Sequence, residues 1–264
     1  MDLDLTGRTA LVTGSTQGIG LAIAEGLAAS GARTVVNGRT ADRVAEAVEG
    51  LRARVPGADV HGAAADVATA EGAAEVVAAF PGVDVLVNNL GIFEARPVLE
   101  VDDDEWRRYF EVNVLSGVRL ARAYLPRMVE RGWGRVQFVA SDSAVAIPAE
   151  MVHYGVTKTA LLGVSRGFAK AVAGTGVTVN TVLAGPTLTG GVETFARGLV
   201  GEDLPWEEVE ARFMAEHRPA SLLHRLIRPE EIAHLVVYLA SDASSATTGG
   251  ALRVDGGYVD AILP

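Results

Sequence analysis

The chain of 264 residues contains no cysteine, which excludes disulfides, thiolate metal ligands and a cysteine nucleophile. It is also poor in positive charge, because 23 lysine and arginine residues stand against 33 acidic residues and give a formal net charge of −10. An anionic chain repels phosphate backbones and anionic lipid surfaces, so neither nucleic acid nor a membrane is an expected partner. The five histidines have no paired metal-ligand spacing, and we expect no metal site.

Long apolar runs are missing as well. No stretch approaches the roughly 20 uncharged apolar residues that a membrane-spanning helix needs. The first residues, MDLDLTGRTALVTG, carry acidic side chains where a secretory signal peptide carries basic ones. We therefore expect no membrane span and a cytoplasmic location. With 49% apolar residues, the chain can bury a large core.

Short apolar runs alternate with longer segments of helical pattern over most of the chain. The longer segments predict helices, among them residues 21–30, 102–131 and 151–173. The short runs predict strands at residues 9–13, 33–37, 84–88, 135–140 and 177–183. This alternation is typical of an α/β fold with a single doubly wound parallel sheet and helices on both faces, a Rossmann-type architecture.

One domain over residues 1–264 is expected, because no low-complexity linker and no change in composition divides the chain. The alternation of strands and helices lapses between residues 187 and 228. Long excursions from a compact domain are often lids, so we expect a substrate lid at residues 190–225.

The first motif with a chemical meaning is LVTGSTQGIG, residues 11–20, which links the first predicted strand to the first predicted helix. Gly14, Gly18 and Gly20 allow a tight turn and a close approach of the backbone, so that a pyrophosphate can meet amide groups at a helix N-terminus. The spacing G-x-x-x-G-x-G differs from the more familiar G-x-G-x-x-G. Taken alone, such a loop can equally be a tight strand-to-helix turn.

Lysine is almost absent, since 21 of the 23 basic residues are arginine. One of the two lysines, Lys158, lies four residues after Tyr154 in a predicted helix, which places both on one face. A neighbouring ammonium lowers the pKa of a phenol, and lysine offers a compact charge that the arginine fork does not. Ser141 ends the preceding predicted strand, where its hydroxyl could hold a substrate oxygen during proton exchange with Tyr154. A surface pair and a strand-ending serine are the alternative interpretations.

Together these residues resemble the short-chain dehydrogenase/reductase family, from the first strand to VDGG near the C-terminal end. The resemblance rests on TGxxxGIG at 13–20, Asp66 after the third strand, NNLG at 88–91, Asn113 in EVNVLSG, Ser141, Tyr154-x-x-x-Lys158, AGPTLT at 184–189 and LRVDGGY at 252–258. As a set, these motifs are far more specific than the glycine loop alone.

The resemblance implies a role for each matched residue. Tyr154 would be the general acid/base, with Lys158 lowering its pKa and binding the nicotinamide ribose. Ser141 would position the substrate carbonyl, and Asn113 would hold a water in the proton relay. The implied cofactor-binding residues are Gly14, Ser15, Thr16, Gly18, Ile19, Gly20, Arg39, Thr40, Asp66, Val67, Asn89, Gly91, Tyr154, Lys158, Thr187 and Thr189.

Three departures from the family pattern concern the substrate side. Leu90 replaces an alanine and is expected near the nicotinamide or substrate, Ala184-Gly185-Pro186 replaces Pro-Gly, and Ser143 is a second serine near Ser141. His153 is expected at the surface, because neighbours on a helix point about 100° apart. The expected substrate positions are largely apolar and suit an aliphatic or aromatic ketone: Leu90, Phe93, Ser143, Val145, Ile147, Met151, Pro186, Val192 and Phe195.

The choice of nicotinamide cofactor is read from VVNGRTADR, residues 35–43. An acidic residue after the second strand would bind the adenosine ribose of NAD and repel the 2′-phosphate of NADP, but the family alignment places Gly38 there. Arg39 and Thr40 follow, and a guanidinium can bind that phosphate. NADP is therefore expected in preference to NAD, although Gln17 stands where many NADP-using relatives carry a basic residue.

The expected function is hydride transfer between NADP(H) and a carbonyl or alcohol substrate of the ketone or 3-oxoacyl type. An NAD-dependent alcohol dehydrogenase and a non-catalytic dinucleotide sensor on the same fold are the alternatives. The expected partner is a small molecule, and the resemblance implies a homotetramer, with a dimer as the alternative.

Overall fold

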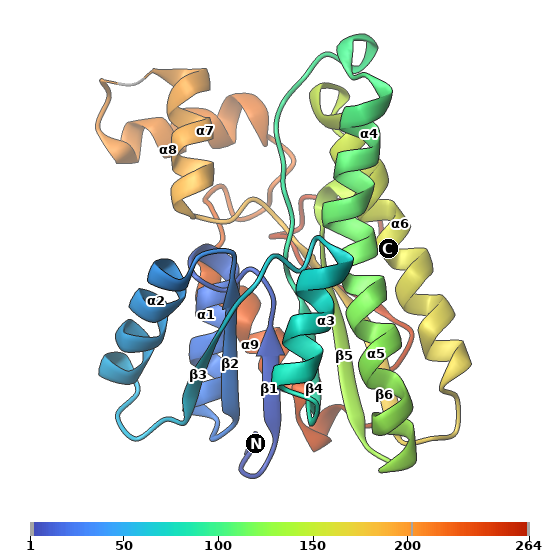
Figure 1. Cartoon of the computed structure of the whole chain (residues 1–264). Coiled ribbons are helices and arrows are strands. Elements are labelled where there is room, and N and C mark those ends of the chain that lie inside the picture. Colours follow the sequence, from blue (N-terminus) through green and yellow to red (C-terminus); the bar gives the residue numbers. More distant parts are fainter. Residues whose placement is uncertain (1–2, 202, 263–264) are drawn as a thin grey trace.

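The computed structural model describes residues 3–201 and 203–262. Within these residues a parallel sheet of seven strands runs through the centre of the molecule in the order β3-β2-β1-β4-β5-β6-β7 (Figure 1). Because the order reverses between β1 and β4, the carboxyl ends of these strands leave a crevice where such folds bind ligands. The strands are β1 Thr9–Val12, β2 Arg33–Gly38, β3 Val60–Ala64, β4 Val85–Asn88, β5 Gly134–Ser141, β6 Val177–Ala184 and β7 Ala251–Val254.

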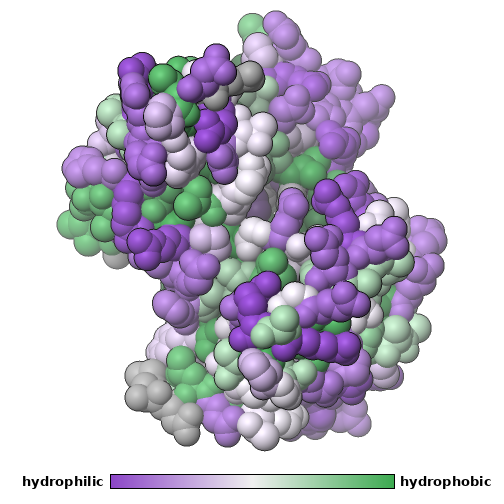
Figure 2. All heavy atoms as spheres, turned by 90° about the vertical axis from the view of Figure 1, so that its left-hand side faces the viewer, coloured by the Kyte–Doolittle hydropathy of each residue, from purple (hydrophilic) through white to green (hydrophobic). Residues whose placement is uncertain are grey.

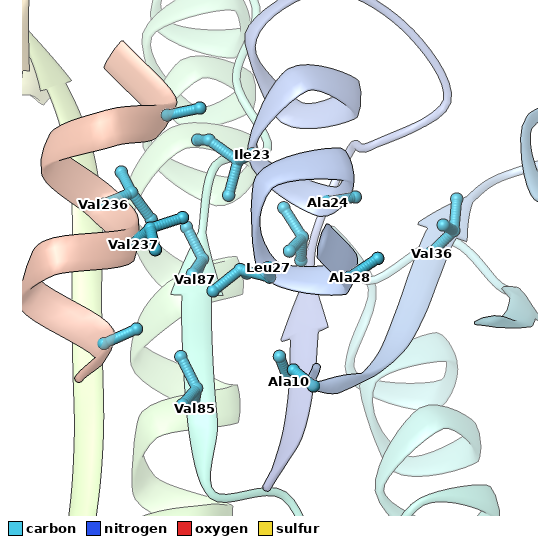
Figure 3. Close-up of a cluster of buried hydrophobic side chains, with 14 of the residues drawn as sticks. Ala10, Ile23, Ala24, Leu27, Ala28, Val36, Val85, Val87, Val236 and Val237 are labelled. Atoms are coloured by element: carbon cyan, nitrogen blue, oxygen red, sulfur yellow. The ribbon is translucent and has the colours of Figure 1, made fainter. Parts of the chain in front are cut away.

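Helices cover both faces of the sheet, which confirms the doubly wound architecture. One face packs against α1 (Gly18–Ala29), α2 (Ala41–Arg54) and α9 (Pro229–Ala240). The other packs against α3 (Ala70–Ala79), α5 (Ser116–Glu130) and α6 (Val152–Ala171). Strand residues alternate between the two cores. In β1, for example, Ala10 and Val12 face the first core, part of which Figure 3 shows, and Leu11 faces the second.

The predicted helix 102–131 is present but irregular in its middle. It consists of α4 (Asp103–Phe110), a π-helical segment η2 (Glu111–Leu115) and α5. Asp102 begins it as an N-cap, because its carboxylate accepts the backbone N–H of Glu105 at 2.8 Å. Asn113 lies in the π segment, and π turns inside α-helices are frequent at functional sites.

The region in which the strand-helix rhythm lapses contains two further helices, α7 (Gly190–Val200) and α8 (Trp206–His217). They stand above the carboxyl-end edge of the sheet (Figure 1) and enclose a small core of their own, formed by Ala196, Val209, Phe213, Met214 and Leu226. At the same height in Figure 2, apolar side chains gather at the surface beside strongly hydrophilic ones.

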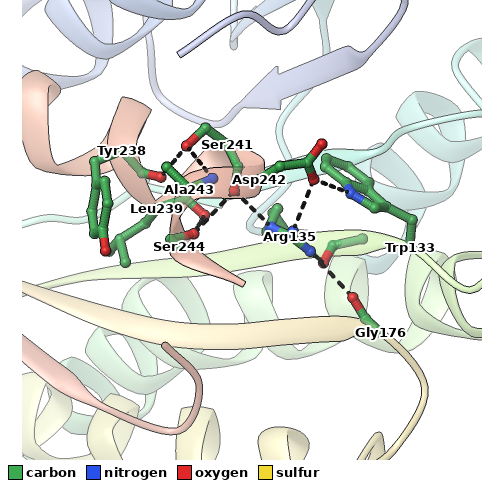
Figure 4. A network of polar contacts seen from close by, with 10 residues as sticks. Trp133, Arg135, Gly176, Tyr238, Leu239, Ser241, Asp242, Ala243 and Ser244 are labelled. Carbon is green, nitrogen blue, oxygen red and sulfur yellow. Dashed lines mark hydrogen bonds and ion pairs between the residues drawn. The ribbon is translucent and has the colours of Figure 1, made fainter. Parts of the chain in front are cut away.

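A buried arginine stabilises the end of the sheet that lies opposite the carboxyl ends of its strands. Arg135, at the start of β5, is 2% exposed and donates hydrogen bonds to the carbonyl oxygens of Gly134, Gly176 and Ser241 (Figure 4). It also forms an ion pair of 3.3 Å with Asp242, which accepts a second hydrogen bond from Trp133. This network joins β5 to the segment after α9, and its place far from the carboxyl ends of the strands argues for a structural role.

Two short 3-10 turns, η3 (Asp142–Ala144) and η4 (Ala149–Met151), lie near the carboxyl ends of the strands, whereas η5 (Asp242–Ser244) follows α9 at the opposite end. In the part of the chain described, no helix combines the length and the apolar character needed to cross a bilayer.

Candidate active site

A cavity of about 440 Å³ opens at the carboxyl ends of β1, β4, β5 and β6, and it is called the central cavity below. The sequence-predicted residues that line it are Gly14, Gly18, Ile19, Gly20, Asn89, Gly91, Phe93, Ser141, Ser143, Met151, Tyr154, Lys158, Pro186, Thr187, Thr189, Val192 and Phe195. Segments more than 170 residues apart in the sequence therefore meet in one space, as the family motifs imply.

The glycine loop forms one wall of the central cavity. Gly14 and Gly18 adopt positive φ angles of 60° and 58°, and a Cβ atom on Gly20 would lie 2.5 Å from the side-chain nitrogen of Asn89. Helix α1 begins at Gly18, and no side chain caps its N-terminus. The backbone amides of its first turn therefore remain open to an anionic group, so this wall fits a dinucleotide pyrophosphate.

Two predicted residues of this loop have other surroundings. The Ser15 hydroxyl is fully buried, donates to the carbonyl oxygen of Val12 at 2.7 Å and accepts the N–H of Asn37 at 3.0 Å. It therefore joins β1 to β2. Thr16 lines a second hollow, formed with Gln17, Leu21, Arg43, Glu46, Ala47, Gly50 and Arg54 against α2.

The β4 loop is tied firmly to the glycine loop. Asn89 donates from its side chain to the carbonyl oxygens of Thr13 and Gly14, both at 3.0 Å, and its backbone N–H donates to the Thr13 hydroxyl at 2.9 Å. A Cβ atom on Gly91 would lie 3.3 Å from the Nζ of Lys158. The glycine at position 91 thus lets the β4 loop approach the lysine closely.

Tyr154 and Lys158 lie one turn apart on α6 and both line the central cavity. The Lys158 Nζ lies 5.6 Å from the centre of the Tyr154 ring and donates to the carbonyl oxygen of Val139 at 3.0 Å. Burial lowers the pKa of Lys158 to about 8. The spacing in the sequence therefore corresponds to two neighbouring groups, one of them a buried amine.

The expected effect of Lys158 on Tyr154 is not found in this structure. Burial raises the pKa of Tyr154, a hydrogen bond with Ser141 lowers it, and the charges of Asp142 and Tyr109 raise it further. Desolvation of the phenolate is the largest cause, and the charges that act on this pKa are those of Asp142 and Tyr109. The prediction that the ammonium leaves the pKa of Tyr154 below its usual range was wrong for the protein without a bound cofactor.

Asn113 does not line the central cavity. Its side chain accepts the N–H of Ile92 at 2.8 Å and donates to the carbonyl oxygen of Ile92 and the hydroxyl of Thr157 at 3.1 and 3.0 Å. The amide is 2% exposed, so it joins the β4 loop to α6 through protein groups. These contacts position both segments, and the water that Asn113 is expected to hold stays a prediction.

The strand-ending serine is followed by a carboxyl group that sequence reasoning missed. Ser141 donates to Oδ1 of Asp142 at 2.6 Å, and the backbone N–H of Ser143 donates to the same oxygen at 2.8 Å. Asp142 is 5% exposed, and burial raises its pKa. A carboxyl group directly after a strand-ending serine was the available signal.

The substrate side is less apolar than expected. Phe93, Met151, Pro186, Val192 and Phe195 line the central cavity as predicted, and Phe213 and Arg218 of the α8 region join them. Leu90, Val145 and Ile147 do not line it. Leu90 packs against the second core instead, and the other two are 38% and 42% exposed. Their contact with substrate stays a prediction.

Besides Ser15, four predicted cofactor residues lie outside both hollows. Arg39 and Thr40 are exposed at the end of β2, whereas Asp66 accepts the N–H of Ala68 after β3 and Val67 is buried in the second core. Arg43, which sequence reasoning missed, lines the second hollow.

His153 is completely buried, with its ring centre 4.3 Å from that of Tyr109, so its expected surface position was wrong. Helix α4 covers this side of α6, which the helical period alone could not reveal.

Comparison with known proteins agrees with the geometry. Residues 14–259 match the family model described as enoyl-(acyl carrier protein) reductase. The chain is 53% identical to the uncharacterized oxidoreductase YvaG of Bacillus subtilis, over 100% of both chains. It is 34% identical to a D-beta-hydroxybutyrate dehydrogenase of Cupriavidus necator, over 97% of this chain and 99% of the other.

The chain belongs to the short-chain dehydrogenase/reductase family. A solved structure of L-sorbose reductase from Gluconobacter frateurii, complexed with NADPH and L-sorbose, superposes with a TM-score of 0.92 at 37% identity and covers 99% of this chain and 100% of that one. Like other short-chain dehydrogenases/reductases, the protein is an NAD(P)-dependent oxidoreductase.

Proposed function

We propose that the protein transfers a hydride between NADP(H) and a ketone or secondary alcohol. The observation that carries this proposal is the meeting of Tyr154, Ser141 and Lys158 in one cavity whose opposite wall is the glycine loop. A dinucleotide sensor needs the glycine loop but has no use for a phenol, a hydroxyl and a buried amine at the nicotinamide end. The cavity thus supports catalysis more than sensing.

The residues of the cavity divide the reaction between them. When bound, NADP(H) supplies or accepts the hydride. The hydrogen of the Ser141 hydroxyl, which Asp142 accepts in this structure, can rotate to the substrate carbonyl oxygen and position that oxygen beside Tyr154. In reduction, Tyr154 gives its proton to that oxygen as the C=O double bond becomes C–O–H. The ammonium of Lys158 then stabilises the phenolate, and oxidation runs in reverse.

NADP(H) is proposed in preference to NAD(H) because basic side chains surround the end of β2. Arg39 forms no hydrogen bond or ion pair with the described residues, and Arg43 lines the hollow next to Thr16. Either guanidinium can bind a 2′-phosphate by charge-assisted hydrogen bonds. The NADPH with which the Gluconobacter enzyme is complexed supports the same choice.

The helices α7 and α8 are proposed as the substrate lid of a single catalytic domain. Val192, Phe195 and Phe213 face the central cavity from these helices, which also carry a core separate from those of the sheet. Closure around a substrate would exclude water from the reacting atoms. A homotetramer remains a prediction from the family resemblance, to be measured by light scattering at micromolar concentration.

The proposal is tested by following nicotinamide absorbance over a panel of ketones, with NADPH and NADH in parallel. We expect consumption of NADPH that depends on the ketone and is lost in Tyr154→Phe. Tight binding of NADPH with no turnover of any ketone or alcohol would favour the sensor. Higher kcat/KM with NADH would favour the NAD-dependent alternative.

A further inference from the structure

The polar end of the central cavity carries a carboxylate oxygen without a partner. Three hydrogen-bond contacts converge on Oδ1 of Asp142, from the Ser141 hydroxyl, the Ser143 N–H and, at 3.4 Å, the Ser143 hydroxyl. Among the described residues, none donates to Oδ2. This oxygen is not among the fully enclosed unpartnered atoms either. Asp142 is 5% exposed and is one of the residues that line the cavity, from which we infer that Oδ2 faces the cavity.

Burial raises the pKa of Asp142, whereas the hydrogen bonds from Ser141 and Ser143 and the charge of Arg218 favour its carboxylate form. Arg218 attracts a negative charge at this position, whereas Asp255 opposes it. The Arg218 guanidinium lies 5.4 Å from the centre of the Phe213 ring and 5.9 Å from that of Tyr258. Among the described residues, Arg218 forms no ion pair of 4 Å or less with Asp142. It therefore offsets the charge of Asp142 without occupying Oδ2.

A carboxylate oxygen that a bound ligand shields from water is costly unless the ligand donates a hydrogen bond to it. The free oxygen belongs to the residue directly after Ser141, and the two side chains are joined at 2.6 Å. A substrate whose carbonyl oxygen is held by Ser141 therefore places the substituent of the next carbon atom close to Asp142. That substituent must donate a hydrogen bond.

We propose that Asp142 Oδ2 accepts a hydrogen bond from a hydroxyl group on the carbon next to the reacting carbonyl, so that the substrates are α-hydroxy ketones and, in the oxidative direction, vicinal diols. This inference rests on the proposed function. It excludes a 2-oxo acid, whose carboxylate would meet the Asp142 carboxylate. It also replaces the expected plain aliphatic or aromatic ketone. Phe93 and Val192 provide an apolar wall for the rest of the carbon chain.

Three compounds that differ in one group test the assignment. 1-Hydroxy-2-butanone, 3-pentanone and 2-oxobutanoate present a hydroxymethyl, an ethyl and a carboxylate group beside the same propanoyl unit. We expect the wild-type kcat/KM for the hydroxy ketone to exceed that for 3-pentanone by about 10²-fold, because a charged acceptor left unpaired penalises the analogue without the hydroxyl. We expect the oxo acid to be the poorest of the three.

Substitution of Asp142 should lower the ratio of kcat/KM between the hydroxy ketone and 3-pentanone. Asp142→Ala lowers kcat/KM for both ketones, since Ser141 loses its acceptor, but it should bring the ratio between them to within about threefold. Asp142→Asn keeps an acceptor without the charge and should reduce the ratio by about tenfold. The matched control is Asp242→Asn at the opposite edge of the sheet, for which the wild-type ratio is expected. NADPH fluorescence titration verifies that each variant still binds cofactor.

Each outcome decides a specific point. An equal loss for both ketones in Asp142→Ala would mean that the carboxylate only positions Ser141, and would overturn the inference while leaving the proposed function intact. A wild-type preference for 2-oxobutanoate that Arg218→Met abolishes would overturn it in favour of an acidic substrate. Failure to reduce any of the three compounds or the wider ketone panel with either nicotinamide would instead remove the proposed function.

Discussion

The amine of Lys158 reaches from α6 to β5, where it donates a hydrogen bond of 3.0 Å to the carbonyl oxygen of Val139. The side chain is 5% exposed, and burial lowers its pKa from 10.5 to about 8. The ammonium that the proposed mechanism needs is thus maintained at a cost to folding. Activity and stability should respond in opposite directions when it is changed.

Lys158→Met should abolish turnover and yet stabilise the fold. Below pH 8 the wild-type amine is charged in both the folded and unfolded states, so the folded state bears the full desolvation cost, up to about 3 kcal/mol for a shift of this size. Wild-type stability should rise as the pH increases from 8 to 10.5, where only the unfolded state still holds the proton. Urea unfolding at pH 7 and 10.5 measures this, and a variant less stable than wild type at pH 7 would contradict it.

Lys158→Arg keeps the charge but should still lower kcat at least tenfold. The planar fork needs more room and more acceptors than the single carbonyl oxygen of Val139 provides. The measurement is kcat at saturating NADPH and ketone. Turnover equal to wild type would show that any cation suffices at this position.

Tyr154→Phe should lower kcat by about 10²–10⁴ while the Kd for NADPH changes little. The substitution removes the proton donor but keeps the ring, and this is the usual contribution of general acid–base catalysis. Steady-state kinetics and fluorescence titration give the two quantities. Near wild-type turnover would assign proton transfer to another group.

Arg39→Leu and Arg43→Leu should each lower kcat/KM for NADPH by about tenfold and leave that for NADH almost unchanged, since each removes a charge that can meet the 2′-phosphate. Arg33→Leu, at the opposite end of β2, is the matched control. An equal loss for both cofactors would mean that neither side chain binds the phosphate.

Gly38→Asp is a poor probe of the same question. A Cβ atom at this position would lie 2.5 Å from Cγ2 of Thr16, so the substitution would displace the glycine loop whatever its charge did.

Limited trypsin digestion should detect closure of the proposed lid. Arg212 on α8 is 51% exposed at its side chain and offers a cleavage site. We expect cleavage there to slow at least fivefold when NADPH and a ketone are both present, because a closed lid opens less often. Arg127, exposed on α5 and outside both hollows, provides an internal comparison. Unchanged cleavage at Arg212 would count against closure.

Glu231 should contribute stability that disappears in strong acid. Its carboxylate accepts two hydrogen bonds from Arg225, at 2.8 and 2.9 Å, and the backbone N–H of Arg228 at the start of α9, and these lower its pKa to about 2. The contribution is present above pH 4.5, the ordinary value, and is lost as the pH falls to 2. We expect Glu231→Gln to lower the free energy of unfolding by about 1 kcal/mol or less at pH 7, because the pair is partly exposed.

Thermal unfolding from pH 2 to pH 7 follows this difference. A gap between wild type and Glu231→Gln that stays constant over this range would mean that the carboxylate is not the cause.

The sequence predicted strands where β-branched residues gather, and missed those where they do not. The run TALV marks β1 clearly, whereas β3, VHGAA, contains glycine and alanines that have low strand propensity. Its place in the sheet comes from pairing with β2 and from cover by Val44 and Val48 of α2. Such strands are determined by tertiary contacts more than by local sequence.

The candidate site likewise contains residues that the sequence marks and residues that only tertiary contacts bring to the cavity. Tyr154 and Lys158 were predictable because helical spacing and a rare residue type both mark them. Arg218 was not, since it reaches the cavity only through the docking of α8. The π turn at Asn113 was equally hidden, because the segment is only five residues long and lies between two regular helices.

The small core under α7 and α8 has a consequence for how this enzyme can change over time. Phe213 packs within that core and also faces the substrate side of the central cavity. The proton-transfer residues instead belong to β5 and α6. Substitutions in and around the α7 and α8 core can therefore reshape substrate choice without loosening the sheet or the proton-transfer residues. New substrate specificities can therefore evolve through mutations in α7 and α8, while the proton-transfer chemistry stays the same.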